Sequence, residues 1–264
     1  MYDGVQLDGI DVTNALRDVV AFRYQLIPTM YSLYVNEYWK KGWPILRPMF
    51  WHHSSDPKML TLDEQFLFGS HVLVAPVTSF GDRTKRVHLP SSVVGSKELP
   101  DWCEMDTGRW HTSTPEGHFI DVDAPVSKTP VLVRAGGILV LGGKCTSTVY
   151  DGEMLRVAHI FPSPSPKNPG ATGSFTLVED DGKTNAHVNE GVYTELEVSF
   201  LAEDEEYIEV DVKVLHNAYA VPYDVIWFVL PVKDKRKMKA KSGTNTEVKV
   251  GDDGRVMLGV HFEL

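Results

Sequence analysis

The sequence predicts a mainly β protein that begins with a short α/β segment. Apolar residues recur at helical spacing between positions 14 and 41, and a short, almost continuously apolar stretch follows at residues 45–51. From residue 69 onward, short apolar stretches are separated by turns rich in glycine, proline and aspartate, a pattern typical of antiparallel sandwiches and barrels. Hydrophobic residues make up 42% of the chain and charged residues 23%, which is ordinary for a folded globular protein.

The first element is a helix that follows Thr13 or Asn14, either of which can cap it. Pro28 should kink this helix, and Gly42 followed by Pro44 should end it. We expect its apolar face to pack against a partner. The residues of that face are Leu16, Val19, Val20, Leu26, Ile27, Met30, Leu33 and Tyr34.

Strands account for most of the remaining chain. Residues 45–51 read as a strand buried on both faces, with Pro48 at its end or at a bulge, and residues 60–68 read as a second short helix. A first run of strands is predicted at 72–77, 86–89, 119–122, 131–135 and 138–141. A second run is predicted at 175–178, 194–200, 207–215, 224–230, 247–250 and 255–262, its last two strands joined by a hairpin loop at 251–254. Between the two runs, residues 161–173 form a long loop rich in proline and glycine.

Charge and composition exclude several classes of function. The net charge of −10 leaves no basic face for nucleic acid, and the one basic run, residues 233–241, reads as a solvated loop or an edge strand. No apolar stretch approaches the roughly 20 residues that a membrane-spanning helix needs. Cys103 and Cys145 allow one disulfide or two free thiols, but they cannot form a metal site alone. We therefore expect no metal and no cofactor, and the localisation stays unknown.

Four segments, in this order, resemble motifs of glycoside hydrolase family 31, which holds α-glucosidases and α-xylosidases. They are residues 23–28 (RYQLIP), 44–50 (PILRPMF), 63–77 (DEQFLFGSHVLVAPV) and 130–138 (PVLVRAGGI). Residues 175–182 (FTLVEDDG) are similar to a strand and turn of the family's distal domain. The resemblance implies that residues 1–68 are the C-terminal end of a (β/α)8 catalytic barrel, with 44–50 as its last strand. It further implies a proximal β-sandwich at 69–142 and a distal β-sandwich at 143–264.

The same resemblance implies that the catalytic residues lie upstream of this chain. A retaining glycosidase needs two carboxyl groups about 5–5.5 Å apart, and family 31 supplies both from earlier barrel strands. Residues 102–106 (WCEMD) have nearly the rhythm of the family's nucleophile motif. Their continuation, TGRW, instead matches a turn of the first sandwich, so we expect a strand and a turn there and no catalytic residue in the chain.

An acidic segment, a histidine pair and two arginines are further candidate functional residues, and a structural role is favoured for most of them. Residues 179–182 (EDDG) are expected to form a turn rather than a cation site. The pair His52 and His53 is not a metal signature, but His52 could approach a substrate pocket, because barrel active sites lie at the C-terminal ends of the strands. Arg47 and Arg134 are expected in structural ion pairs rather than in sugar contacts.

Aromatic residues near the predicted barrel end are assigned to the core or to an interface. Trp39, Trp43 and Trp51 could stack on sugar rings, yet aromatics at the ends of helices and strands more often pack inside the protein.

The resemblance implies a C-terminal fragment of a retaining α-glycosidase that hydrolyses terminal α-linked glucose or xylose. This fragment would complete and brace the barrel, its partner would be the remainder of that barrel, and alone it would be inactive. The alternative is a non-catalytic carbohydrate-binding or scaffolding β-sandwich protein, since one fold serves many functions. A complete enzyme with a site in the sandwiches is a third possibility.

Overall fold

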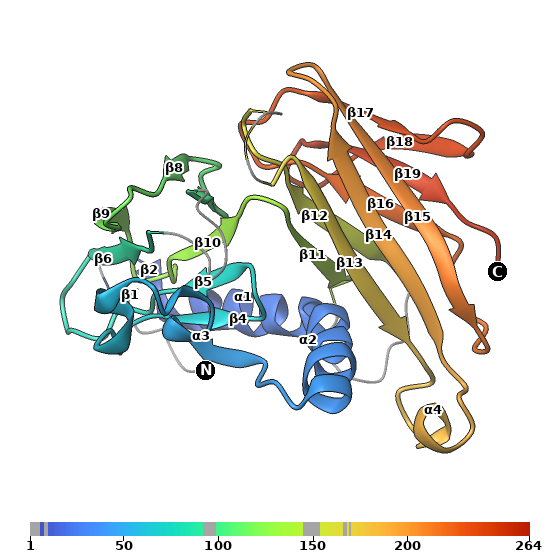
Figure 1. Ribbon diagram of the computed structural model, residues 1–264, viewed down its shortest axis with the longest axis horizontal. Coiled ribbons are helices and arrows are strands. Elements are labelled where there is room, and N and C mark those ends of the chain that lie inside the picture. Colours follow the sequence, from blue (N-terminus) through green and yellow to red (C-terminus); the bar gives the residue numbers. More distant parts are fainter. Residues whose placement is uncertain (1–5, 8–9, 92–98, 145–153, 166–167, 169) are drawn as a thin grey trace.

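The computed structural model describes residues 6–7, 10–91, 99–144, 154–165, 168 and 170–264, and it is mainly β with helices near the N-terminus (Figure 1). The two short strands β1 (Gln6–Leu7) and β2 (Ile10–Asp11) pair with each other. Three helical segments follow: α1 (Val12–Gln25), α2 (Ile27–Leu33) and η1 (Tyr34–Trp39), the last a π-helical turn.

The caps and breaks of these helices follow from local chemistry. Asp11 caps α1, because its carboxylate accepts hydrogen bonds from the backbone N–H groups of Thr13 and Asn14, so neither Thr13 nor Asn14 is the cap that the sequence predicted. The predicted break is confirmed at Leu26, between α1 and α2. Pro28 lies in the first turn of α2, where a missing N–H donor costs no helical hydrogen bond.

A six-stranded antiparallel sheet follows the helices among the described residues, in the order β3-β4-β5-β10-β7-β8. Its strands are β3 (Leu46–Pro48), β4 (Phe66–Phe68), β5 (Val72–Val74), β7 (Asp101–Glu104), β8 (Trp110–Thr112) and β10 (Val131–Arg134). β3 pairs with β4 in the register Leu46↔Phe68, so this sheet continues across residue 68, where the sequence placed a domain boundary.

The segment between β3 and β4 differs from the sequence prediction. The strand expected at 45–51 is shorter, since a helical turn, α3 (Phe50–His53), replaces its second half. The helix expected at 60–68 is wrong: a 3-10 turn, η2 (Pro57–Leu60), comes first and the strand β4 ends the segment. Leu67 and Phe68 are buried in β4 between β3 and β5, so pairing within the sheet overrides the helical pattern.

A two-stranded sheet covers one face of the six-stranded sheet. It pairs β6 (Thr84–Leu89) with β9 (His118–Asp123). Buried side chains from both sheets form one core that includes Leu73, Val87, Trp102 and Leu132. The opposite face of the six-stranded sheet packs against side chains of α2, such as Met30.

The second β unit consists of two sheets packed face to face. The five-stranded sheet has the order β11-β12-β16-β19-β18, and the four-stranded sheet has the order β13-β14-β15-β17. The bounds are β11 (Gly137–Gly142), β12 (Arg156–Phe161), β13 (Thr172–Glu179), β14 (Thr194–Ala202), β15 (Tyr207–Asn217), β16 (Val225–Val229), β17 (Lys237–Ala240), β18 (Thr246–Val250) and β19 (Val256–His261). A short helix, α4 (Ala186–Asn189), lies between β13 and β14.

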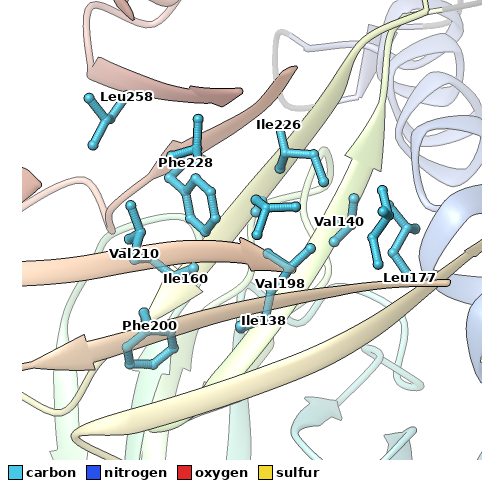
Figure 2. Close-up of a cluster of buried hydrophobic side chains, with 14 of the residues drawn as sticks. Ile138, Val140, Ile160, Leu177, Val198, Phe200, Val210, Ile226, Phe228 and Leu258 are labelled. Atoms are coloured by element: carbon cyan, nitrogen blue, oxygen red, sulfur yellow. The ribbon is translucent and has the colours of Figure 1, made fainter. Parts of the chain in front are cut away.

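Apolar side chains from both of these sheets meet in the largest core of the molecule. Ile138, Ile226 and Phe228 come from the five-stranded sheet, whereas Val198 and Phe200 come from the four-stranded one (Figure 2). The six strands predicted in this region are confirmed within a few residues, and so is the hairpin loop between β18 and β19. Most pairs are antiparallel, but β12–β16 and β15–β17 are parallel, which the sequence did not predict.

The helix α2 covers the edges of both sheets of this sandwich. β11 and β13 are edge strands, and an uncovered edge leaves backbone groups without partners. The Thr29 hydroxyl donates to the carbonyl of Val140 (2.7 Å) and accepts from its N–H (2.9 Å). The Ser32 hydroxyl accepts from the N–H of Val178 (2.9 Å). Short polar side chains of one helix thus replace a missing neighbouring strand on both sheets.

Candidate functional site

The strongest candidate site is a cluster of two arginines and two histidines where β3, α3, η1 and β10 meet. Arg47 of β3 lies at its centre, and its side chain is only 1% exposed. Its guanidinium pairs with Glu37 of η1 (Nη2 to Oε2, 2.8 Å) and donates to the carbonyl of Pro44 (2.7 Å). The structural ion pair that the sequence predicted for Arg47 is therefore confirmed.

Glu37 balances charge on more than one neighbour. Its second carboxylate oxygen pairs with Lys41 at 2.8 Å. Burial raises the pKa of Glu37, but the hydrogen bonds and charges of Lys41 and Arg47 outweigh it and hold the pKa below its usual value. Glu37 is therefore ionised and shared between two cations.

His52 lies on α3 against the second fork of Arg47. The Arg47 Nη1 donates to His52 Nε2 at 2.7 Å, and the ring also meets Trp43 edge-on, with 6.3 Å between the ring centroids. Burial and the charges of Arg47 and Arg134 lower the pKa of His52 to about 4. His52 is therefore neutral near pH 7 and acts as an acceptor, while its contact with a substrate stays a prediction.

Arg134 and His71 form the second pair of the cluster. Arg134 Nη2 donates to His71 Nε2 at 3.0 Å, and the other ring nitrogen of His71 lies 2.8 Å from the hydroxyl of Ser70. Burial, followed by the charge of Arg134, lowers the pKa of His71 to about 3, and burial lowers the pKa of Arg134 to about 10. The ion pair predicted for Arg134 is not formed with any carboxylate of the described residues, because a neutral histidine occupies that position instead.

Sequence reasoning missed this second pair. His71 lies in the tight turn between β4 and β5, and no spacing or motif singled it out. Its only signal was a histidine between a predicted short helix and a predicted apolar strand, a position where an ordinary turn residue is expected.

The segment that resembles a nucleophile motif is a strand and a turn, as its continuation indicated. Trp102 is fully buried in β7, and the chain turns at Gly108, whose φ is +65°. Glu104 accepts hydrogen bonds from Thr107 and from His111 (2.7 Å). Burial raises the pKa of Glu104, yet these hydrogen bonds and the charge of Arg109 bring it below its usual value, so this carboxylate is held ionised by structural partners.

The acidic segment 179–182 is also a turn. Glu179 pairs with Arg156, and the Asp180 carboxylate is contacted by Tyr31 and by His187. The Asp181 carboxylate accepts from the N–H groups of residues 183 and 184, which helps to lower its pKa to about 2. Across the described parts of the chain, no three His, Cys, Asp or Glu side chains are grouped in a way that could hold a metal ion.

The tryptophans near the cluster lie at the surface rather than in the core. Trp43 stacks edge-on with Trp51 (centroids 6.2 Å apart), and the guanidinium of Arg47 lies 5.3 Å from the Trp43 ring. Trp39 meets the ring of His187. All three tryptophans are 39–45% exposed, and Trp43 and Trp51 form the rim of the cluster.

Cys103 is buried in β7 as a free thiol, and burial raises its pKa to about 12. Cys145 lies outside the described residues. No described helix is long and apolar enough to span a membrane.

The fold places the chain in a class of mainly β proteins built from several antiparallel sheets with a helical segment packed across them. Residues 42–139 match the model of the glycosyl hydrolase family 31 C-terminal domain, which confirms the resemblance to this family over that segment of the chain.

Individual proteins of known name are also similar to this chain in sequence or in structure. The chain is 33% identical over 168 residues to an α-xylosidase of Saccharolobus solfataricus, a match that covers 62% of this chain and 20% of the relative. It is 25% identical over 169 residues to α-glucosidase 2 of Bacillus thermoamyloliquefaciens, covering 64% of this chain and 19% of the relative. A dextranase of Flavobacterium johnsoniae has a similar structure, with a TM-score of 0.73 and 23% identity, over 94% of this chain and 31% of that chain. The chain thus spans about a fifth of the length of these curated relatives.

Proposed function

We propose that this chain is the C-terminal part of a retaining α-glycosidase that acts on terminal α-linked glucose or xylose. In this role it completes and braces a catalytic barrel whose two carboxylates lie upstream, and the chain alone is inactive. The enzyme would form a glycosyl-enzyme intermediate and hydrolyse it with water, without a cofactor. The relatives named α-xylosidase and α-glucosidase support the choice of sugars.

The observation that carries this proposal is the uncovered apolar face of α1. This helix has no buried residue, and three apolar side chains on one face stay open to solvent: Leu16 (60% exposed), Val19 (52%) and Val20 (52%). A helix of this kind normally buries such a stripe against a neighbour. The stripe continues the predicted helix face, so its partner is a further part of the same catalytic unit.

The domain organisation remains part of this proposal, with residues 1–68 as the barrel end, 69–142 as the proximal sandwich and 143–264 as the distal one. The elements within residues 1–68 differ in how many neighbours they already have in the structure. β4 has neighbours on both sides in the six-stranded sheet, whereas β3 is an edge strand and α1 has an uncovered face. The free edge of β3 and the face of α1 are therefore the parts of residues 1–68 that would pack against the remaining barrel.

His52 is proposed to border the substrate pocket of the complete enzyme. It lies beside the exposed rim of Trp43 and Trp51, and its neutral ring is already fixed by Arg47. If His52 contacts substrate, His52→Gln in the complete enzyme should raise KM more than it lowers kcat. His111→Gln, a change at a histidine on β8, serves as the control.

The decisive experiment compares this chain with a longer polypeptide that includes the upstream sequence. We expect hydrolysis of an aryl α-glucoside or α-xyloside by the longer polypeptide only, and a W-x-D-M-N-E motif in frame upstream. Hydrolysis by this chain alone would contradict the assignment of the catalytic groups. An upstream sequence without a barrel would contradict the proposal as a whole.

A second candidate function, carbohydrate binding without catalysis, is favoured by one cleft. This cleft of about 380 Å³ lies between the two β units and is lined by Trp110, Glu205, Lys233 and Arg236, among others. An aromatic ring beside charged hydrogen-bonding groups suits a sugar. Calorimetric titration of the whole chain with maltooligosaccharides tests it, and binding that is lost in Trp110→Ala would favour this function.

A further inference from the structure

A cleft of about 350 Å³ lies where α2 and η1 meet the turn between β4 and β5 and the strands β11 and β13 (Figure 1). Its lining includes the apolar side chains of Leu33, Phe68 and Leu139 beside several polar ones. A volume of this size is within the range of small-molecule sites in proteins. The cleft is separate from the one that contains Trp110, and neither function proposed above uses it.

Two contacts fix the walls of this cleft relative to each other. Asn36 of η1 donates through Nδ2 to the carbonyl of Thr176 on β13 at 2.9 Å. The turn between β4 and β5 is held against α2, because Gly69 has a φ of +64° and an added Cβ there would lie 3.2 Å from the side chain of Leu33. The two residues after Gly69 are thereby held at the wall, and the cleft is preformed.

His71 leaves the hydroxyl hydrogen of Ser70 available to a ligand in the cleft. The Nε2 atom of His71 accepts from Arg134 at 3.0 Å, so the neutral ring carries its proton on Nδ1. That N–H donates to the oxygen of Ser70 at 2.8 Å. The hydroxyl of Ser70 is therefore a donor without an acceptor among the described residues, and both side chains line the cleft.

Two lysines of η1 and the segment after it add charged donors at the same cleft. Lys41 has a side chain that is 52% exposed, and it uses one of its three N–H groups on Glu37. Lys40 is 43% exposed and contacts Glu195 and Asn36, which leaves one N–H group for a ligand. Both ammonium groups thus have access and unused donors.

The remaining polar lining also offers donors rather than free acceptors. The hydroxyls of Ser174 and Thr176 have no hydrogen-bond partner among the described residues. Glu37 lines the cleft as well, but one of its oxygens pairs with Arg47 and the other with Lys41. A ligand that brings several strong acceptors therefore suits this cleft best.

The charge around the cleft is positive, although the whole chain carries −10. Four cations against two carboxylates give +2 for the charged residues that line the cleft or contact its lining: Arg47, Arg134, Lys40 and Lys41 against Glu37 and Glu195. Glu197 neighbours Thr176 in the sheet, but it does not line the cleft and lies opposite Lys213 in register. A surplus of this sign attracts anions.

We propose that this cleft binds a phosphate group, either as the monoester of a small hydroxylated molecule or as free phosphate. Phosphate has a charge near −2 and three acceptor oxygens, which match the surplus charge and the unused donors. The cations that line the cleft are lysines, which bind phosphate as point charges, whereas the arginine fork that suits a planar carboxylate stays behind the wall. The inference does not depend on the proposed function, because every group belongs to the described chain.

Isothermal titration calorimetry of the whole chain tests this site, with glucose 6-phosphate, inorganic phosphate, acetate and glucose as separate probes. We expect at least one phosphate-bearing probe to bind with a millimolar or lower Kd, about tenfold or more below the Kd of acetate and of glucose. Tighter binding of glucose 6-phosphate than of inorganic phosphate identifies an ester as the ligand, and equal binding identifies free phosphate. Either result supports the site.

Two variants test the named contacts. Lys41→Gln and Ser70→Ala should each weaken phosphate binding by about 3- to 10-fold, because each removes one hydrogen bond to the anion. Lys233→Gln removes a lysine from the cleft that contains Trp110, and as the matched control it should bind as the wild type does. Ser70→Ala leaves the charge unchanged and keeps the test decisive if Lys41→Gln fails to fold.

The position of the bound ligand is read from backbone amide NMR, in which the signals of Ser70 and Ser174 should shift on addition of glucose 6-phosphate. Shifts confined to Trp110 and Lys233 would place the ligand in the other cleft and overturn the assignment. Acetate or glucose binding as tightly as the phosphate probes would show that phosphate is not the group recognised. Absence of binding by both phosphate probes, or binding unaffected by both variants, would likewise contradict the proposal.

Discussion

The N-terminal helix and the distal sandwich use their apolar residues in opposite ways. In the sandwich, side chains from two sheets enclose Phe228 and Ile226 completely, so each sheet is the other's partner. In α1, the apolar side chains of Leu16, Val19 and Val20 stay in solvent, since no described element covers them. The same kind of pattern thus marks a self-sufficient core in one region and an exposed apolar face in the other. The two regions differ in how far their apolar side chains are buried.

The largest effect should come from the sandwich core. We expect Phe228→Ala to lower the free energy of unfolding by about 3–5 kcal/mol, because it leaves a cavity among fully buried side chains. Leu16→Ala on α1 is the contrasting change and should cost under about 0.5 kcal/mol. Urea unfolding followed by circular dichroism measures both. Similar losses for the two variants would remove the contrast between the regions.

Acid should weaken the chain through its buried histidines. His71 and His159 have pKa values of about 3, lowered first by burial, against about 6.5 in an unfolded chain. The unfolded state therefore takes up protons first as the pH falls, so stability is lost progressively from about pH 6.5 down to about pH 3. At pH 5 the loss should reach about 1–2 kcal/mol for each histidine.

We expect this loss of stability to appear in Tm, measured from pH 7 to pH 4 for the wild type and for His71→Gln. The variant should lose less Tm over this range than the wild type does. His261→Gln, at a more exposed histidine, is the matched change. An identical slope for His71→Gln and the wild type would contradict the prediction.

The contact between α2 and the sandwich edges should have an intermediate effect. Thr29→Val removes both hydrogen bonds to Val140 and keeps the shape of the side chain, so we expect a loss of about 1–2 kcal/mol. Amide hydrogen exchange at Val140 should accelerate at the same time. Thr61→Val, at an exposed threonine, serves as the control and should change neither quantity. Unchanged exchange at Val140 would show that the edge is protected in another way.

The smallest expected effect is on the reactivity of the Cys103 thiol. Its thiol is buried, and its pKa of about 12 keeps it protonated near pH 7, so it should not react with a thiol reagent in the folded protein. A Cys145→Ser background isolates the signal of Cys103. Reaction should then appear only in denaturant, and rapid reaction in the native state would show that this sheet opens readily.

Much of the fold was predictable from the sequence, because strands with alternating apolar residues need only local information. The strands of the distal sandwich lie where the pattern placed them, and the break near Pro28 follows from the chemistry of proline. β8 and β12 were missed, since Trp110 and Arg156 lie in segments whose alternation is weak. The helix predicted at 60–68 is wrong because the structure of this segment depends on the pairing of β4 with β3, which is distant in the sequence, and with β5, which lies across a turn.

The candidate site was predictable only in part. Arg47 and His52 stood out as polar residues at a predicted strand, and the ion pair of Arg47 was correctly expected. The pairing of Arg134 with His71 depends on how β10 lies beside β5, a register that no local pattern specifies.

The hydrogen bonds of α2 also set an order of events during synthesis. Thr29 precedes Val140 by 111 residues, and Ser32 precedes Val178 by 146. At ~5–20 residues per second, the ribosome needs roughly 5–30 s to deliver these partners after the helix has emerged. α2 is joined directly to α1 and η1, so the helical segment can form before its partners exist. Its Thr29 and Ser32 hydroxyls can bond to Val140 and Val178 only after the sandwich whose edges it covers has been made.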